Sequence, residues 1–209
     1  MKILLTKQSY FFNLTFLIFL ILSNLNLNCQ TTKSFPTALG GGANSRSTQA
    51  YSVYEVTNLN SLGPGSLLEG MRQSNTIVVF RVSGIISMNE ASQTSISNTV
   101  SNNIILGQTA PYPGITVVGN GFKYTNGTNI ITRYIRFRQW RCRTELHAPC
   151  SSDVIDHCSF AFGGDESLST RFASSNFTLQ NSIVSYGLSG GLFGDSADYT
   201  LGFNYSSIG

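Results

Sequence analysis

Short apolar runs separated by Gly, Ser, Thr and Asn fill the chain after residue 30, and they lack the 3.6-residue spacing of amphipathic helices. The one exception is SLLEGMRQ, residues 66–73, whose pattern fits a short helix. Charged residues make up only 11% of the sequence, which disfavours long exposed helices, whereas the recurring Ile, Val and Phe favour strands joined by turns. The pattern therefore predicts an all-β protein.

Four of these runs repeat at a fixed spacing along the second half of the chain. Their starts are 23 residues apart, although the last aligns slightly better with a step of 22, and they are NIITRYIRF from Asn129, SDVIDHCSF from Ser152, SNFTLQNSI from Ser175 and DYTLGFNYS from Asp198. A period of this length is typical of solenoids, and the regularly spaced leucines of leucine-rich repeats are missing. We therefore predict a parallel β-helix, in which successive coils stack about 4.8 Å apart.

Stacking of equivalent positions predicts columns of side chains that run from coil to coil. The column expected to point into the core consists of Ile131, Val154, Phe177 and Tyr199, and the same core is extended by Phe137, Cys158 or Phe160, and Ile183. The runs at 76–86, 102–108 and 114–121 are expected to supply earlier coils. Residues 66–73 are expected to cap the open amino-terminal end, because the end of a solenoid needs cover.

Polar residues fall into columns as well. Arg133 and Asp156 share one column, one coil apart, and they predict an ion pair that supports the strands. The neighbouring column carries Tyr134, His157 and Gln180, so we expect His157 to lie in a polar ladder.

The amino terminus has the pattern of a secretory signal, because Lys2 and Lys7 precede an apolar run, residues 11–22, that is short for a membrane span. We expect residues 1–29 to be removed and residues 30–209 to form a secreted, extracellular domain; a retained signal anchor is the alternative. Removal takes away two lysines and no acid, so the net charge falls from +3 to +1. Such a small net charge argues against a nucleic-acid partner.

Export permits disulfides and glycans. Cys142 and Cys150 flank a loop-like stretch and could pair, whereas Cys158 lies in a strand pattern and is expected to be buried. Glycosylation sequons begin at Asn126, Asn176 and Asn204.

Six motifs resemble, in order, the landmarks of the pectate lyase family of polysaccharide lyases: VYEVTNLNSLGPGSLLEGMRQ, IVVFRVSGII, ILGQTAPYPGITVVGNG, ITRYIRFR, VIDHCSFAFGGDESLS and FTLQNSIVSYGL. The resemblance runs from about Phe35 to the end of the sequence. It implies a right-handed parallel β-helix and an extracellular, monomeric enzyme that cleaves pectate, a polymer of galacturonate, by β-elimination. In that reaction calcium bridges enzyme and substrate carboxylates and acidifies the C5 proton.

The resemblance also implies roles for individual residues. Asp165, with Glu166 beside it, matches an acidic position that helps to hold calcium, while Asp156 and His157 match an Asp-His landmark that supports the strand. A second acidic ligand of the family has no clear counterpart, because His147 stands at its place and only Glu145 offers a substitute.

The resemblance places the catalytic arginine on a coil beyond NYSSIG, so the sequence is expected to be truncated at its carboxyl end and residues 30–209 alone are expected not to cleave the polymer. Two functions follow: a calcium-dependent pectate lyase, or a catalytically inactive β-helix that binds acidic polysaccharide or serves as a surface protein.

The densest charge cluster has five arginines in the eleven residues from 133 to 143. One interpretation is a cationic strip that binds the carboxylates of the substrate, with Trp140 stacking on sugar rings; its members are Arg136, Arg138, Arg141 and Arg143. The other is that these side chains lie on solvated faces of strands and loops. The pattern leaves both open.

Overall fold

The structure, a computed structural model, describes residues 33–44, 50–88, 94–96, 100–119, 122–125, 127–139, 144–147, 152–163, 167–171, 175–187 and 201–203. The chain divides into two compact units, Met1–Thr31 and Thr32–Gly209. The predicted signal, residues 1–29, lies outside the described residues, so its removal stays a prediction. In the described ranges, no helix has the length and apolar character needed to cross a membrane.

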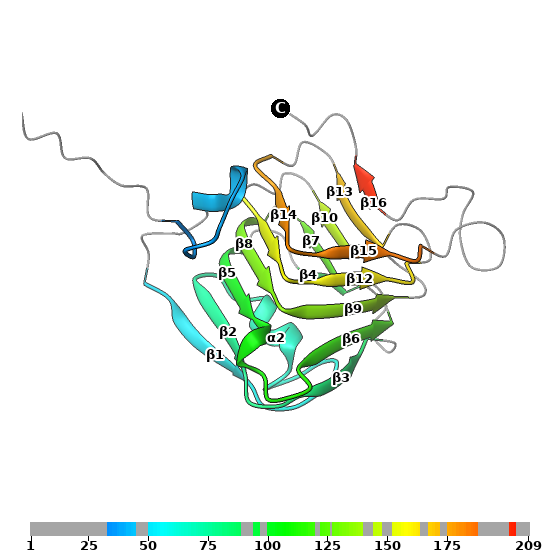
Figure 1. Cartoon of the computed structure of the whole chain (residues 1–209). Helices are drawn as coiled ribbons and strands as arrows, with labels where there is room; N and C mark the ends of the chain where they lie inside the picture. The colour runs from blue at the N-terminus through cyan, green and yellow to red at the C-terminus, as the bar shows by residue number, and fades with distance from the viewer. Residues whose placement is uncertain are drawn as a thin grey trace, which may run out of the picture. The chain divides into compact units, whose positions relative to one another are not determined.

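Three parallel sheets form the walls of a β-solenoid, as the sequence predicted (Figure 1). In spatial order, sheet A contains β1 (Ser52–Val56), β2 (Thr76–Phe80), β5 (Ser101–Leu106), β8 (Thr128–Arg133), β11 (Val154–Asp156) and β14 (Thr178–Gln180). Sheet B contains β3 (Gly84–Ser87), β6 (Ile115–Gly119), β9 (Ile135–Gln139), β12 (Ser159–Ala161) and β15 (Ile183–Ser185). Sheet C contains β4 (Thr94–Ile96), β7 (Phe122–Thr125), β10 (Thr144–His147), β13 (Leu168–Arg171) and β16 (Leu201–Phe203).

Residues with left-handed backbone turn the chain at the corners of the coils. Asn75 directly precedes β2, and Asn102 and Asn129 are the second residues of β5 and β8; all three have φ between 52° and 58°. Asparagine tolerates this conformation better than most residues, and its amide can bond to the next coil. The Nδ2 of Asn102 donates to Oδ1 of Asn75 at 2.7 Å, and Nδ2 of Asn129 donates to Oδ1 of Asn102 at 2.8 Å. This ladder keeps the coils in register at the start of sheet A.

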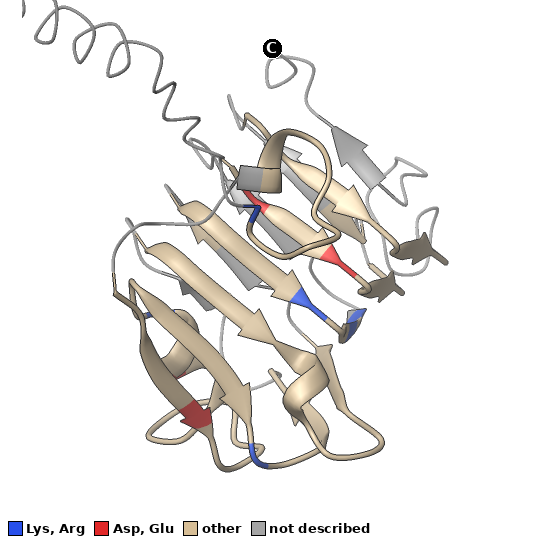
Figure 2. Ribbon diagram, turned by 60° about the vertical axis from the view of Figure 1, so that its left-hand side comes forward, with Lys and Arg blue, Asp and Glu red and all other residues tan. Residues whose placement is uncertain are grey.

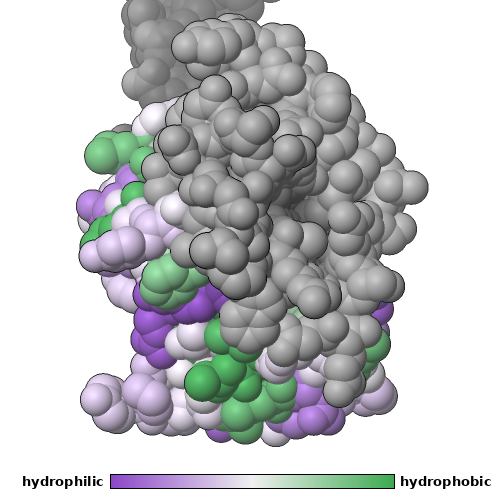
Figure 3. Space-filling view, turned by 90° about the vertical axis from the view of Figure 1, so that its right-hand side faces the viewer, coloured by the Kyte–Doolittle hydropathy of each residue, from purple (hydrophilic) through white to green (hydrophobic). Residues whose placement is uncertain are grey.

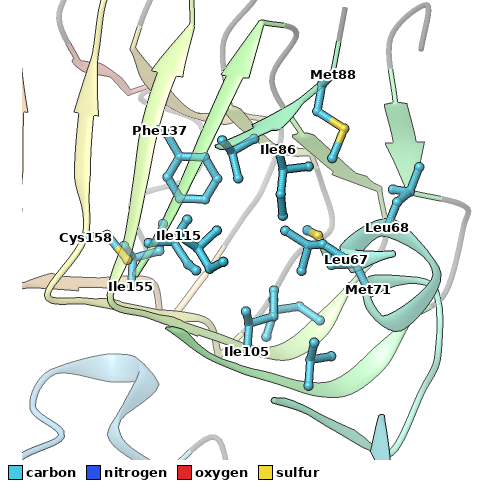
Figure 4. Close-up of a cluster of buried hydrophobic side chains, with 14 of the residues drawn as sticks. Leu67, Leu68, Met71, Ile86, Met88, Ile105, Ile115, Phe137, Ile155 and Cys158 are labelled. Carbon is cyan, nitrogen blue, oxygen red and sulfur yellow. The ribbon is translucent and has the colours of Figure 1, made fainter. Parts of the chain in front are cut away.

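The interior of the solenoid is filled by stacked apolar side chains, with the rings of Phe137 and Phe160 4.8 Å apart. The helix α2 (Leu67–Met71) lies at the amino-terminal end. Ser66 caps its start, because the Oγ of Ser66 accepts a hydrogen bond from the N–H of Glu69. The helix directs its apolar residues into the core (Figure 4): Leu67, Leu68 and Met71. The predicted cap over this end is confirmed.

The predicted apolar column is wrong in direction. Ile130 and Ile155 join the core, so Ile131 and Val154 beside them point out of the solenoid, because neighbouring side chains of a strand alternate between faces. Val154 pairs with Thr178, a step of 24 residues, so Phe177 lies one position out of the column, although it packs against the core as predicted. Tyr199 lies outside the described residues.

Two other expected positions also move. Phe160 pairs with Val184, which packs against the core, while Ile183 faces outward and is 66% exposed. The fourth repeat belongs to another sheet, because β16 pairs with β13 of sheet C. Aligning strand-like segments of the sequence by residue type does not show which of the three sheets each segment belongs to, since the strands of all three sheets contain the same residue types.

An amino-terminal segment, residues 34–43, covers the outward apolar residues of sheet A; we call it the strap (Figure 1). It includes most of the short 3₁₀ turn η1 (Gly41–Asn44). The N–H of Gly42 donates to Oγ1 of Thr178 at 3.0 Å, and the N–H of Leu39 donates to Oε1 of Gln180 at 2.9 Å. Nε2 of Gln180 returns a bond to the carbonyl of Thr37 at 3.1 Å. The strap therefore excludes solvent from the outer face of β11 and β14 and hydrogen-bonds to side chains of β14.

The strap approaches the sheet so closely that it needs glycine. A Cβ at Gly42 would lie 2.4 Å from the carbonyl oxygen of Asp153 and 2.7 Å from Cγ2 of Val154. We expect Gly42→Ala to lift the strap and lower the free energy of unfolding by about 1–3 kcal/mol, the usual cost of overpacking. Thermal melting measures this change. Leu39→Ala on the same segment is the control, because Leu39 is exposed and should change little; equal melting of both variants and the parent would contradict the packing of the strap.

Candidate functional site

The predicted ion pair between Arg133 and Asp156 is present on the outer face of sheet A. Nε and Nη2 of Arg133 each lie 2.7 Å from Oδ2 of Asp156, whose side chain is fully buried. The guanidinium also lies 3.9 Å from the ring centroid of Phe35 in the strap, a cation–π contact. Figure 2 shows how few charged residues this sheet carries. The pair is thus enclosed between sheet and strap.

The other carboxylate oxygen of Asp156 completes a closed network. Oδ1 accepts Nε2 of Gln180 at 2.9 Å and Nδ2 of Asn181 at 3.0 Å, and Nδ1 of His157 lies 2.9 Å away. Burial opposes ionisation of Asp156, but the hydrogen bonds from Asn181, Gln180, His157 and Arg133 outweigh it and lower the pKa to about 2. Both carboxylate oxygens are engaged by protein groups, so the arrangement supports the fold and leaves neither oxygen of Asp156 without a partner.

The polar ladder differs by one residue from its prediction. Gln180 pairs with Asp156 in register and so belongs to the column of Arg133. Asn181 follows at the corner, where Tyr134 and His157 occupy the equivalent left-handed positions. The rings of Tyr134 and His157 stack with centroids 4.6 Å apart. The ladder therefore exists, with Asn181 in the place expected for Gln180.

The stretch 153–169 carries four carboxylates, and sequence reasoning overlooked the first of them. Asp153 is 2% exposed, and its Oδ1 accepts the N–H of Ile130 at 2.8 Å. Burial raises its pKa to about 8, although the bond from Ile130 acts in the opposite direction. Cys158 is buried as predicted, and burial raises the pKa of its thiol to about 12, which makes it unreactive.

The arginines of the predicted cationic strip are partly described. Arg136 donates from Nε to Oγ1 of Thr116 at 2.8 Å and from Nη2 to the carbonyl of Pro113 at 2.9 Å. Arg138 donates from Nη1 to the carbonyls of Phe137 and Ser159, and from Nη2 to Oγ of Ser159. Both side chains are half-buried, and they clamp the coils before and after their own. Within the described ranges neither meets a carboxylate, so both keep a net positive charge.

The remaining predicted site residues lie outside the described residues, and their roles stay predictions: Asp165, Glu166, Arg141, Arg143, Trp140, Cys142, Cys150, Asn126 and Asn204. Asn176 is described and exposed, while Thr178 of its sequon is buried under the strap.

The backbone register bears on the expected calcium ligands. Glu145 of β10 lies opposite Lys123 of β7 and Ser169 of β13. Asp165 and Glu166 belong to the segment that joins β12 to β13, and only Ser167 separates Glu166 from the strand that pairs with β10. Among the residues that the structure describes, no group of three or more His, Cys, Asp or Glu could hold a metal ion.

We expect Arg133→Ala to lower the free energy of unfolding by about 3 kcal/mol, the lower end of the range for breaking a buried ion pair. The lower end applies because Gln180, Asn181 and His157 still contact the Asp156 carboxylate. Chemical denaturation measures the change. Arg81→Ala removes the arginine of an exposed pair with Glu55 and should have almost no effect. Equal stability of both variants would show that the Arg133 pair is not buried.

Asp153 predicts a pH dependence of stability. Its pKa is raised from about 3.9 in the unfolded chain to about 8 in the folded protein, so its contribution is complete below pH 4 and is lost as the pH rises through 8. Asp153→Asn keeps an acceptor for Ile130 but cannot ionise. From pH 5 to pH 8 the free energy of unfolding of the parent should therefore fall relative to that of the variant, by at most about 1.4 kcal/mol per pH unit, and thermal melting measures this difference. A constant difference across this range would show that Asp153 does not titrate there.

Known proteins resemble this chain over most of its length. A protein named probable pectate lyase C from Aspergillus terreus is 40% identical over 160 residues, which are 74% of this chain and 37% of the relative. Its namesake from Aspergillus fumigatus is 41% identical over the same shares. The one from Emericella nidulans is 39% identical over 168 residues, 77% of this chain and 39% of the relative. No family model matches the chain.

The matched segment thus spans less than two fifths of the length of these relatives. The part of the chain that matches these relatives also has the stacked parallel coils that the motifs predicted. Over this segment the chain is a homologue of the proteins named probable pectate lyase C.

Proposed function

We propose that the protein is a secreted polysaccharide lyase that cleaves pectate by calcium-dependent β-elimination. The observation that carries this proposal is the identity of about 40% to proteins named probable pectate lyase C across 160 residues of the solenoid. Secretion is proposed from the signal-like residues 1–29, and it would permit glycans at the three sequons and a disulfide between Cys142 and Cys150.

The donor set of the chain fits calcium, because Asp165, Glu166 and Glu145 all offer carboxylate oxygens. Asp165 and Glu166 lie two to three residues before β13, and β13 pairs with the strand that contains Glu145. His147 on the same strand is a poor ligand for this cation. We propose that Asp165 and Glu166 hold the ion and that Glu145 replaces the missing acidic ligand. Bound calcium would bridge to a substrate carboxylate and acidify the C5 proton.

The general base is a separate requirement, because a group must reach the C5 proton of the substrate. Arg133 does not meet this requirement, since Asp156 and the strap enclose it. Arg136 and Arg138 face the outside of sheet B and bind neighbouring carbonyls, which suits positioning more than proton transfer. We therefore assign the base to no described residue and propose that it belongs to a later coil, as the family resemblance implies.

The test is cleavage of polygalacturonate by the full-length gene product, followed by the ultraviolet absorbance of the unsaturated product. We expect activity with millimolar calcium and none with a chelator. Asp165→Asn should reduce activity by a factor on the order of 10² at the same calcium concentration, because it removes a charged ligand. Glu69→Gln is the matched control, since Glu69 is an exposed acid paired with Arg72 on α2.

Calcium should also raise the melting temperature of the parent through binding to the native state, and Asp165→Asn should remove this shift. Binding of the polymer without cleavage would favour the second function, a catalytically inactive β-helix that binds acidic polysaccharide. Full activity of Asp165→Asn would contradict the assignment of the metal site.

A further inference from the structure

The outer face of sheet B presents a column of side chains that do not contribute to the core. In β9 and β12 the inward residues are Phe137 and Phe160, so Arg136, Arg138 and Ser159 point outward. Register extends the Arg136 column in both directions, and its members are Ile85, Thr116, Arg136, Ser159 and Ile183. Ile85 and Ile183 are 62% and 66% exposed, so cationic and apolar groups share this face.

The two arginines of this face lack a counter-ion in the described part of the chain. They are two residues apart in β9, so their Cα atoms are separated by about 6.7 Å along one side of the strand. Burial and the charge of Arg136 both lower the pKa of Arg138, so the field at its guanidinium is unfavourable. The bonds to neighbouring carbonyls engage N–H groups of both arginines but do not neutralise their positive charges. The two hydrogen bonds of Arg136 use Nε and Nη2, not Nη1. An anion at this face would offset the repulsion.

Two aromatic residues lie at the carboxyl ends of the adjacent strands. Phe162 follows β12 and Tyr186 follows β15, and the N–H of Phe162 donates to the carbonyl of Tyr186 at 2.9 Å. Their ring centroids are 5.9 Å apart, and the residues are 41% and 74% exposed. Figure 3 faces this side of the solenoid, where hydrophobic and hydrophilic residues lie next to each other.

These aromatic residues adopt an unfavourable backbone conformation. Phe162 and Tyr186 have φ of 64° and 50°, a left-handed conformation that bulky residues rarely adopt. At the corners that begin sheet A, asparagine fills such positions and bonds from coil to coil. Large exposed rings in a strained conformation bring little stability to the fold, so binding is the better explanation for them.

We propose that the outer face of sheet B is a binding surface for acidic polysaccharide, in which Arg136 and Arg138 bind uronate carboxylates and Phe162 and Tyr186 stack against sugar rings. The choice of a uronate polymer rests on the proposed function; the paired guanidiniums and the adjacent rings do not. The guanidinium charge attracts carboxylates, which can accept the N–H groups that the neighbouring carbonyls leave unused, and aromatic rings cover the apolar faces of sugars. Arg136, Arg138 and Tyr186 belong to sheet B and its ends, whereas Phe162 shares the segment between β12 and β13 with the proposed calcium ligands Asp165 and Glu166. The surface would hold the polymer alongside the site of cleavage.

The experiment separates binding from cleavage. The full-length protein is run through native gels that contain polygalacturonate and a calcium chelator, so that retardation measures binding without turnover. We expect Tyr186→Ala and Arg138→Gln each to weaken binding about tenfold, which corresponds to about 1.4 kcal/mol. Tyr112→Ala and Arg72→Gln are matched controls, because Tyr112 is an exposed tyrosine before β6 and Arg72 is an exposed arginine that directly follows α2. Both should bind like the parent.

Arg138→Gln also removes bonds between coils, so its melting temperature is measured beside its binding. Tyr186→Ala removes an exposed ring and should melt like the parent; its binding alone decides the role of the aromatic pair. Retardation of the parent that is equal in gels of a neutral glucan would overturn the uronate specificity. Unchanged binding of Tyr186→Ala and Arg138→Gln would overturn the surface, even if the parent cleaves pectate. Loss of binding in these variants would support the surface, even if no cleavage is detected.

Discussion

Asp156 is a fully buried carboxylate on the outer side of a sheet, where the solenoid by itself offers no cover. Its charge is tolerated because Arg133 neutralises it and because Gln180, Asn181 and His157 engage its second oxygen. These partners come from three successive coils, so the network forms only when β8, β11 and β14 are in register. The strap then covers the network and the apolar Ile131 and Val154 beside it. Register, charge burial and strap therefore depend on one another.

Local sequence patterns were sufficient for the main architecture. The repeat near Asn129, Ser152 and Ser175 predicts stacked parallel coils, and the helical pattern at 66–73 predicts the amino-terminal cap. Both predictions agree with the structure, because the spacing of apolar residues that indicates a strand or a helix can be read from a short local segment. The pair of Arg133 and Asp156 could be predicted as well, since the coil length between them is regular.

The direction of the columns could not be predicted from the same pattern. Ile131 and Val154 are as apolar as core residues, and only the docking of the strap, which lies far from them in the sequence, explains how apolar residues can face outward and still be buried. The step from Val154 to Thr178 is one residue longer than the previous step, which moved the assignments of Phe177, Gln180 and Ile183 in the third repeat by one. The signal that sequence reasoning passed over is the run Gly40–Gly42, whose lack of side chains permits the close approach of the strap. The calcium ligands stay predictions, because Asp165 and Glu166 lie outside the described residues.

The strap also has a consequence for the order of events during synthesis. Its bonds join residues 37–42 to residues 178–180, with sequence separations of 136 to 143 residues. A ribosome makes the strap first, but its docking surface exists only after β14 has been translated and stacked. Contacts of such long sequence separation form late and slowly, because the intervening chain must be ordered first. Until then Ile131, Val154 and the Asp156 network face water, so the nascent chain passes through a stage in which an apolar, partly charged sheet surface is open to chaperones or to other chains.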